Sequence, residues 1–585
     1  MAQSDARFGY RADLKRSDHD LSQKRGFTTP PGMLNPIWFD LATPGDSYYM
    51  EHNMPLLRSN VLAAPSMVDV NVHYETFFVP LQMLYQPIEN TLFSIDSLQS
   101  SLYGDTSTYL NSVFPVIDYS DFITEIKALT DNGELRANAF RLADLLGLNA
   151  INWCTSYAPQ EGYTPNFFPY QLLCYQCIFQ YYYRLDDKSS FTPQFFNMDR
   201  FYATSTPVTG NAFGLDLWRL NSRPWDFDYF TSLYRSPLVS DANMQQILPT
   251  NRYSDLNSVN TIKANASGGP TASNEQTRDF SSYIGTSHNN TELINSISTA
   301  AIRQIFANEK LAMITGRTRK NYDSQVLAHY GVNVPHDVKH DITMIHHDVY
   351  HLNVQEVTSL ASTSDAPLGD LAGKSYAAGN GEKFKFTAPC HGVIMTIFSV
   401  EPRKRYFGGF DKINSVTNAF DLPTPEFDRL GNQPMYRYES GFSALPSDTR
   451  TNADIIGWKE RYYQFKRKHD VCSWAFGYGN QYSTTNTWSS YMLAFLPFAT
   501  YEDSNNRPQQ RPDLSSRFYI EWSAMDALCL VRYKYGWKSY SDADHEDWNA
   551  TPWLLYQRDP FIVNSHIICK KVSWMSKDGE PIYDF

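Results

Sequence analysis

The chain has 585 residues and a formal net charge of −12, with 19% charged, 42% hydrophobic and 15% aromatic residues. The aromatic content excludes a wholly disordered chain, and the acidic balance excludes a protein that coats nucleic acid with its whole surface. Apolar stretches such as Val393–Val400 and Tyr491–Ala499 are much shorter than the roughly 18 to 20 residues of a membrane-spanning helix, so we expect no such helix.

Residues 1–30 are polar and end at the break Pro30–Gly32. They contain no apolar core of a secretory signal, so we expect no signal peptide. A segment of this composition cannot bury enough apolar area to fold alone. We therefore predict an N-terminal arm over residues 1–30, which becomes ordered on a partner, followed by a single domain over residues 31–585. The basic residues of the arm are Arg7, Arg11, Lys15, Arg16, Lys24 and Arg25.

Four segments have the pattern of β-strands. Met67–Val79 alternates apolar and polar residues and then becomes continuously apolar, as expected for a strand with one buried face. Lys383–Val400 contains an alternating part, a break at Pro389 and a β-branched run. Two further strands are predicted near the C-terminus, at Trp522–Tyr535 and Pro560–Cys569. Strands near both ends of the chain predict a mainly β protein, in which one sandwich is closed and the connections contain most of the residues.

Two segments have the pattern of helices. Ser298–Thr315 places apolar residues at near-helical spacing, with Ser298 as an N-cap and Gly316 at the left-handed C-terminal position. Pro169–Leu185 begins with a proline at a plausible N1 position and is apolar and aromatic on most faces. We therefore expect the second helix to be covered on all sides.

The seven cysteines are too few, and odd in number, for a secreted scaffold held by disulfides. Cys174 and Cys177 form a C-x-x-C sequence, but they lie within the apolar run LLCYQCIFQYYYRL and no second pair is near. We predict that both are buried small hydrophobic residues, and that the chain is made in a reducing cytosol.

Between Ser240 and Ser298 the composition changes to Asn, Ser, Thr and Gly, and no strand or helix period remains. Loops of this length are uncommon and are often functional. The segment is therefore favoured as an exposed surface loop that meets a partner, with a simple connector as the alternative.

No nucleophile elbow, phosphate-binding loop or zinc-protease motif is present, so we expect a protein that is not an enzyme and has no cofactor. Asp226 and Asp228 in WDFD could share one face of a strand as an acid and base pair, which is the basis of an alternative function in carbohydrate cleavage. Six histidines lie close together in sequence, without a cysteine partner or a fixed helical face. We expect surface or interface imidazoles there and no metal site. These are His329, His336, His340, His346, His347 and His351.

Five blocks of sequence, in the order of the family, resemble the major capsid protein of microviruses, the small icosahedral bacteriophages with single-stranded DNA. The first block is RFGYRADLKRSDHDLSQKRGFTTPPGMLNPIWFDLATPGDSYYM, in which Pro44–Asp46 matches the family's P-G-D turn. MVDVNVHYETFFVPLQMLY is similar to its D-x-x-x-F-F-V-P strand, and FFPYQLLCYQCIFQYYYR to its aromatic helix. WDFDYFTS resembles its DYFTS segment. IRQIFANEKLAMITGRTRKNYDSQVLAHYGVNVP resembles its helix and the motif Y-x-x-x-L-x-x-x-F/Y-G-V-x-x-P.

This resemblance implies a single eight-stranded jelly roll with long loop insertions and a few short helices, assembled as a T=1 icosahedral shell. It implies a virion protein that assembles in the cytoplasm of a host bacterium. The implied partners are copies of itself, the single-stranded DNA genome, a bacterial surface receptor and other virion proteins, including a small basic DNA-binding protein and a spike or pilot protein. In the family an insertion can form a surface protrusion, for which residues 240–298 are the candidate here and residues 96–150 the alternative.

Contact with a genome requires local positive charge, because phosphate neutralisation drives binding that is independent of sequence. A solvated or inter-subunit arm is an equally open interpretation of the basic N-terminal residues. The alternative function from another class is an all-β carbohydrate-binding or carbohydrate-cleaving protein, whose aromatic residues would line a sugar groove. A receptor-binding fibre is disfavoured because the chain has no internal repeats. The candidate DNA-binding residues are Arg7, Arg11, Lys15, Arg16, Lys24, Arg25, Arg317, Arg319 and Lys320.

Overall fold

The structure is a computed structural model of the whole chain. The residues that it describes are 16–59, 67–84, 117–119, 122, 126, 133–148, 166–183, 218–233, 261–265, 275–279, 342–358, 371–406, 409–417, 421–425, 428, 431–440, 455–474, 476, 494–495, 501–502, 508–509, 531–533, 536–538, 559–575 and 577.

The protein is mainly β, and its principal sheet is antiparallel. Along the sheet the strands follow the order β1-β21-β4-β11-β10-β5-β12-β3, and β2 also pairs with β21. These strands are β1 (Ser17–Asp20), β2 (Gln23–Thr29), β3 (Asn35–Ala42), β4 (Ser47–Ser59), β5 (Val70–Pro80), β10 (Thr343–Thr358), β11 (Leu371–Thr387), β12 (Gly392–Pro402) and β21 (Phe561–Ser573).

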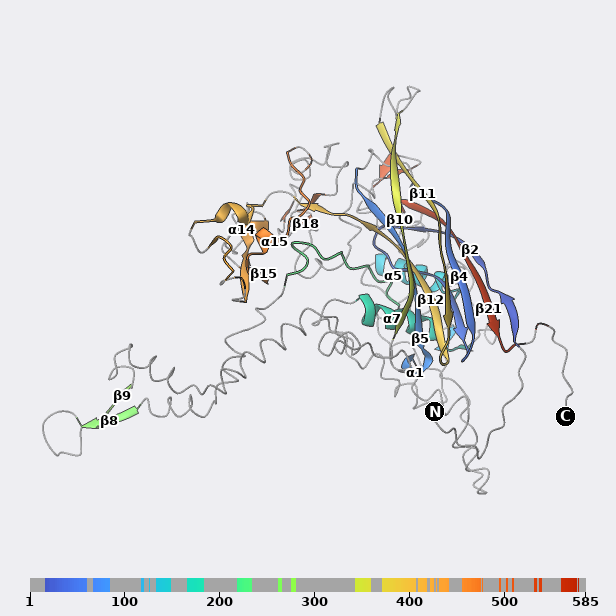
Figure 1. Ribbon diagram of the computed structural model, residues 1–585, viewed down its shortest axis with the longest axis horizontal. Helices are drawn as coiled ribbons and strands as arrows, with labels where there is room; N and C mark the ends of the chain where they lie inside the picture. The colour runs from blue at the N-terminus through green and yellow to red at the C-terminus, as the bar shows by residue number, and fades with distance from the viewer. Residues whose placement is uncertain are drawn as a thin grey trace, which may run out of the picture.

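The principal sheet folds into two layers, which β10 and β11 connect (Figure 1). The first part of β10 pairs with β5, and its last part, Asn353–Thr358, pairs with β11. Rings from the two layers meet in the interior. Phe78 of β5 lies 5.1 Å from Phe386 of β11, and Phe398 of β12 lies 5.2 Å from Phe27 of β2, between ring centroids. The aromatic residues of the strands therefore form the core between two sheets.

A layer of helices and turns, which we call the helical layer, covers the outer faces of β3, β5 and β12. It consists of α5 (Gly133–Leu145), α7 (Tyr170–Ile178), the π-helix η2 (Phe179–Tyr183) and the segment 218–233. Successive side chains of a strand point to opposite faces. Thr76 and Phe78 of β5 therefore point into the sandwich, whereas Phe77 meets Tyr182 of η2, with 4.8 Å between ring centroids. Coverage on both faces explains why β5 and β12 are buried along almost their whole length, including their polar residues.

The expectation that residues 1–30 form an arm is wrong for the part that the structure describes. β1 and β2 pair with β21 over Ser17–Asp20 and Gln23–Thr29 and complete one edge of the sheet. Their polar composition is compatible with this position, because natural edge strands are commonly short and charged. Residues 1–15 lie outside the described residues.

Three of the predicted strands are confirmed, as β5, as β11 followed by β12, and as β21. Within the predicted strand at 522–535, the described residues form β19 (Val531–Tyr533), which pairs with β20 (Gly536–Lys538). The aromatic helix is also present as α7, buried from Leu172 to Ile178, although Pro169 is its N-cap and not its N1 residue. The predicted helix at 298–315 lies outside the described residues.

A smaller lobe lies beside the sandwich (Figure 1). Its elements are the 3-10 helix η6 (Lys412–Ser415), β14 (Asn432–Tyr436), α14 (Arg437–Ser440), β15 (Ile455–Glu460) and α15 (Tyr463–Lys466). The remaining elements are α1 (Leu81–Leu84) and the pairs β6 (Ile117–Asp118) with β7 (Asn166–Phe167), β8 (Thr261–Asn265) with β9 (Glu275–Asp279), β13 (Arg405–Tyr406) with β16 (Ala494–Phe495), and β17 (Tyr501–Glu502) with β18 (Pro508–Gln509). Among the described residues, no helix has the length and apolar character required to cross a bilayer.

Candidate functional site

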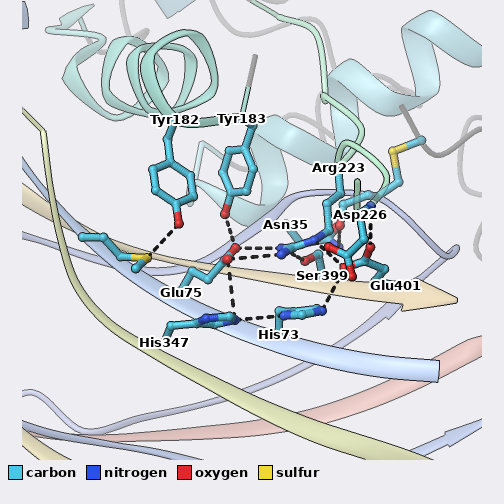
Figure 2. A network of polar contacts seen from close by, with 12 residues as sticks. Asn35, His73, Glu75, Tyr182, Tyr183, Arg223, Asp226, His347, Ser399 and Glu401 are labelled. Carbon is cyan, nitrogen blue, oxygen red and sulfur yellow. Dashed lines mark hydrogen bonds and ion pairs between the residues drawn. The ribbon is translucent and has the colours of Figure 1, made fainter. Parts of the chain in front are cut away.

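A network of buried charges lies between the sheet and the helical layer (Figure 2). At its centre the guanidinium of Arg223 lies between two carboxylates: Nη1 is 2.8 Å from Glu75 Oε2, and Nε is 3.0 Å from Glu401 Oε2. The same Nη1 donates to Ser399 Oγ at 3.0 Å. All four side chains are buried, so each charge depends on its protein partners in place of water.

Strand register places the two carboxylates on the same face of the sheet. Glu75 of β5 pairs with Ile397 of β12, which is four residues before Glu401 and on the same face. Arg223 comes from the segment 218–233, which is attached to the sheet by backbone contacts. The backbone amide of Arg223 donates a hydrogen bond to the carbonyl oxygen of Gly32 at 2.6 Å. The Asp226 amide donates to Glu401 Oε1 at 3.1 Å.

The arginine controls the ionisation of the carboxylates. Burial alone would raise the pKa of Glu75, but the charge and hydrogen bonds of Arg223 outweigh it and hold that pKa below its ordinary value. Burial likewise raises the pKa of Glu401, but the adjacent His73 and Arg223 outweigh this effect and hold the pKa below its ordinary value. Tyr183 of η2 donates its hydroxyl to Glu75, and burial strongly raises the pKa of that phenol. The network therefore contains ionised carboxylates and a neutral tyrosine.

Two histidines complete the network. His73 Nδ1 lies 2.9 Å from His347 Nε2, and that Nε2 lies 3.6 Å from Glu75 Oε1. On the other side of its ring, His73 Nε2 lies 3.0 Å from Glu401 Oε2, as an ion-pair contact and not as an aligned hydrogen bond. Sequence reasoning included His347 but missed His73, because 274 positions separate the two residues.

Only part of the predicted histidine cluster lies within the described residues. His346, His347 and His351 are all in β10, whereas His329, His336 and His340 lie outside the described part of the chain. His346 contacts Asp348 at 3.1 Å, and His351 contacts Asn71 at 2.8 Å on the exposed side. The strand distributes these three side chains over both faces, so they do not form one common site.

The candidate DNA-binding residues are dispersed where they are described. Arg16 stacks over the Trp574 ring at 4.1 Å, and Lys24 is exposed on β2. Arg25 donates to the carbonyl of Leu145, the last residue of α5, where a cation complements the helix dipole. This contact gives Arg25 a role within the subunit. Arg7, Arg11, Lys15, Arg317, Arg319 and Lys320 lie outside the described residues.

The WDFD carboxylates are used for structure. Residues 225–228 have no regular secondary structure and precede a turn at residues 229–232, so Asp226 and Asp228 do not share a strand face. Asp228 accepts hydrogen bonds from the Phe230 amide and the Tyr406 hydroxyl and pairs with Lys404 at 3.0 Å. Because Asp228 caps a turn with these partners, the described geometry does not assemble the acid and base pair of a carbohydrate-cleaving site.

Large apolar side chains are exposed on the smaller lobe. The indole of Trp474 is 84% exposed, and the residue has a left-handed backbone with φ of +55°. Side chains of this type are enriched at protein interfaces. The other exposed large apolar residues of the lobe are Phe410, Leu422, Ile455, Phe465 and Val471. We call these six residues the lobe patch.

Comparison with known proteins decides the family. The sequence profile of the capsid protein (F protein) family matches residues 10–108 and 161–538, which is more than half of the chain. The chain belongs to this capsid protein family. Capsid protein VP1 of Chlamydia phage 1 is 24% identical over 599 aligned residues, which cover 87% of this chain and 94% of that protein. Capsid protein VP1 of Bdellovibrio phage phiMH2K is 29% identical over 108 residues, which cover 18% of this chain and 20% of that protein.

These matches confirm the microvirus family that the five sequence blocks predicted. Membership in the capsid protein family gives the chain a structural role in a virion. In such a subunit the buried ion network would have a structural role, because it attaches the helical layer to the sheet through charges that are shielded from water. Cys174 and Cys177 are both buried, as predicted, and burial raises the pKa of the Cys174 thiol.

Proposed function

We propose that this chain is the major capsid protein of a T=1 icosahedral shell that encloses a single-stranded DNA genome. The observation that carries the proposal is membership in the capsid protein family over most of the chain. A shell requires each subunit to bury several patches of roughly 800 Å² per partner, with aromatic side chains at their centres. The lobe patch and the high aromatic content are compatible with this requirement.

We infer that the sandwich is a jelly roll. Its strand order supports this topology: the layers β2-β21-β4-β11 and β3-β12-β5-β10 each combine strands from the first 80 residues with strands that follow residue 342. A jelly roll of two Greek keys produces such an order of eight strands. Here β1 and β2 both pair with β21 and together occupy the position of the first strand.

The lobe patch is proposed as a contact between subunits. Trp474→Ala removes its most exposed ring without altering the sandwich, so we expect folded subunits with a reduced yield of closed particles. Lys383→Ala is the matched control, because Lys383 is also highly exposed but ends in a charged group and belongs to β11 of the sandwich. Sedimentation separates particles from free subunits. A wild-type particle yield from Trp474→Ala would contradict this assignment.

DNA contact is proposed for the basic residues Arg7, Arg11 and Lys15, with Arg317, Arg319 and Lys320. Because β1 and β2 belong to the sandwich, the informative deletion is residues 2–15, which leaves both strands intact. We expect assembled particles with less packaged DNA, measured as nuclease-protected nucleic acid per particle. A normal DNA content in these particles would contradict a genome role for the arm. A small basic virion protein is the other proposed source of charge.

The surface protrusion is proposed to lie within residues 240–298 and to contribute to host attachment. In Figure 1 the β8–β9 pair lies apart from the sandwich, which is compatible with a protruding segment. Deletion of residues 261–279 is expected to leave assembly intact and to reduce adsorption of the phage to its host. A capsid map with residues 251–291 on the inner wall would contradict this proposal.

A further inference from the structure

Three potential metal ligands converge on the face of the sheet that the helical layer covers (Figure 2). They are His73, Glu75 and His347, each of which offers one ligand atom within 4.8 Å of those of the other two. The contacts between His73 Nδ1 and His347 Nε2 and between His347 Nε2 and Glu75 Oε1 identify the facing atoms. His73 and Glu75 belong to β5, and His347 is the direct partner of Glu75 in the register of β10. Rigid neighbouring strands therefore hold all three ligands.

The spacing of these atoms fits a small first-row dication. Zinc bonds of about 2.0 to 2.2 Å in a tetrahedral site place the ligand atoms roughly 3.3 Å apart. The two distances from His347 Nε2 are 2.9 Å to His73 Nδ1 and 3.6 Å to Glu75 Oε1, which lie on either side of that value. Two imidazoles and one carboxylate form a ligand set that zinc commonly accepts, with a water in the fourth position.

The surroundings orient each ligand. Arg223 and Tyr183 hold Glu75 Oε2. Arg223 Nη2 also lies 3.3 Å from Oε1, which in turn lies 3.6 Å from His347 Nε2. His73 Nε2 lies against the Glu401 carboxylate, a position that favours a proton on Nε2 and leaves the lone pair on Nδ1. Ligating histidines typically have such a carboxylate on the opposite ring nitrogen, and ligating carboxylates are themselves hydrogen-bonded.

Charge and access also fit a cation. The carboxylates on this face are Glu75, Glu401, Asp226 and Asp228, and the cations that pair with them are Arg223 and Lys404. Lys459 also interacts with Asp228, so the four carboxylates outnumber the three cations by one, which is compatible with a bound cation. The His347 side chain is 31% exposed, so an ion has a path from solvent to the site.

We propose that His73, Glu75 and His347 bind one divalent transition-metal ion of the zinc type, which links β5 to β10 beneath the helical layer. This site differs from the expectation of no metal, which considered only the histidines that are close in sequence. The ion would add a cross-link between strands that come from distant parts of the chain, and so stabilise the subunit.

The test uses the untagged, full-length chain, stripped of metal by a chelator and titrated with Zn²⁺ and Co²⁺. We expect one ion per chain, visible absorption bands of low-coordinate Co²⁺, and a higher unfolding temperature with Zn²⁺. His347→Ala should weaken binding by more than about 100-fold, since it removes a direct ligand. His347→Gln is a second variant that keeps a polar group next to His73 if the alanine variant folds poorly.

His351→Ala is the matched control, because His351 lies on the same strand and contacts Asn71 instead of the site. It should bind the ion with the affinity of the wild type. Absence of stoichiometric binding by the wild-type chain would overturn the proposal. Equal affinity of the wild type and both His347 variants would also overturn it, because the ion would then bind elsewhere. Neither result would alter the membership in the capsid family.

Discussion

Arg223 and Glu75 form a two-pronged ion pair across the boundary between the helical layer and the sheet. Nη1 of Arg223 lies 2.8 Å from Oε2 of Glu75, and Nη2 lies 3.3 Å from Oε1, although 148 positions separate the residues in the chain. Both side chains are buried. This pair and its partner Glu401 attach the segment 218–233 to the sheet.

Arg223→Met is expected to destabilise the subunit strongly. The substitution keeps most of the side-chain volume but leaves Glu75 and Glu401 buried without their cation, at a cost of about 3 to 5 kcal/mol. Arg403→Ala is the control, because Arg403 pairs with Asp470 at the surface, where a pair contributes roughly 0 to 1 kcal/mol. The midpoint of unfolding in urea measures both. Similar midpoints for the two variants would contradict the role of the buried network.

Gly392→Ala is expected to disrupt the packing between β12 and β5. A Cβ atom at Gly392 would lie 2.4 Å from the Phe78 ring and 2.7 Å from Val79 O, and the backbone oxygen cannot rotate away. Overpacking of this kind costs about 1 to 3 kcal/mol. At Gly26 of β2 the nearest atom to such a Cβ is 3.9 Å away, so Gly26→Ala should change stability by less than about 0.5 kcal/mol. Thermal unfolding of the two variants tests the comparison.

Lys459 should make stability depend on pH. Burial lowers its pKa to about 8, against an ordinary value near 10.5, and its ammonium contacts Ser232. Between these two pKa values the unfolded chain binds more protons than the folded chain. The penalty for burying this lysine is therefore complete below pH 8 and declines as the pH rises towards 10.5.

Lys459→Met removes this penalty. We expect the variant to be more stable than the wild type at pH 7, by up to about 3 kcal/mol, and the difference to shrink by pH 10. Urea unfolding at a series of pH values measures the difference between the two proteins. A difference that is constant from pH 7 to pH 10 would show that Lys459 is not buried as a cation.

The elements that could be predicted from the sequence are those with strong local patterns. β5 and β12 each contain a long apolar run because they are buried on both faces, and α7 is largely apolar for the same reason. β1 and β2 were missed because SDHD and QKRGFTT have no apolar alternation. Such edge strands are specified by pairing with β21, which lies more than 500 residues away in the chain.

The buried network could not be predicted for a similar reason. Glu75, Arg223 and Glu401 come from three distant segments, and each looks like an ordinary surface charge in its own sequence context. Only the register of β5 with β12 and the attachment of the segment 218–233 bring them together. For the histidine cluster, the sequence suggested a contact that does not form. The histidines are close in sequence, but β10 places its members on opposite faces, and His347 pairs with the distant His73.

The central claim is that copies of this chain close into a shell, and the mass of the assembled protein tests it most directly. A T=1 particle contains roughly sixty copies of the 67.1 kDa chain, so native mass measurement of the purified protein should give roughly 4 MDa, or partial assemblies with defined subunit numbers. The contradicting result would be a chain that remains a 67.1 kDa monomer at high concentration, even when the other proteins of the particle are added.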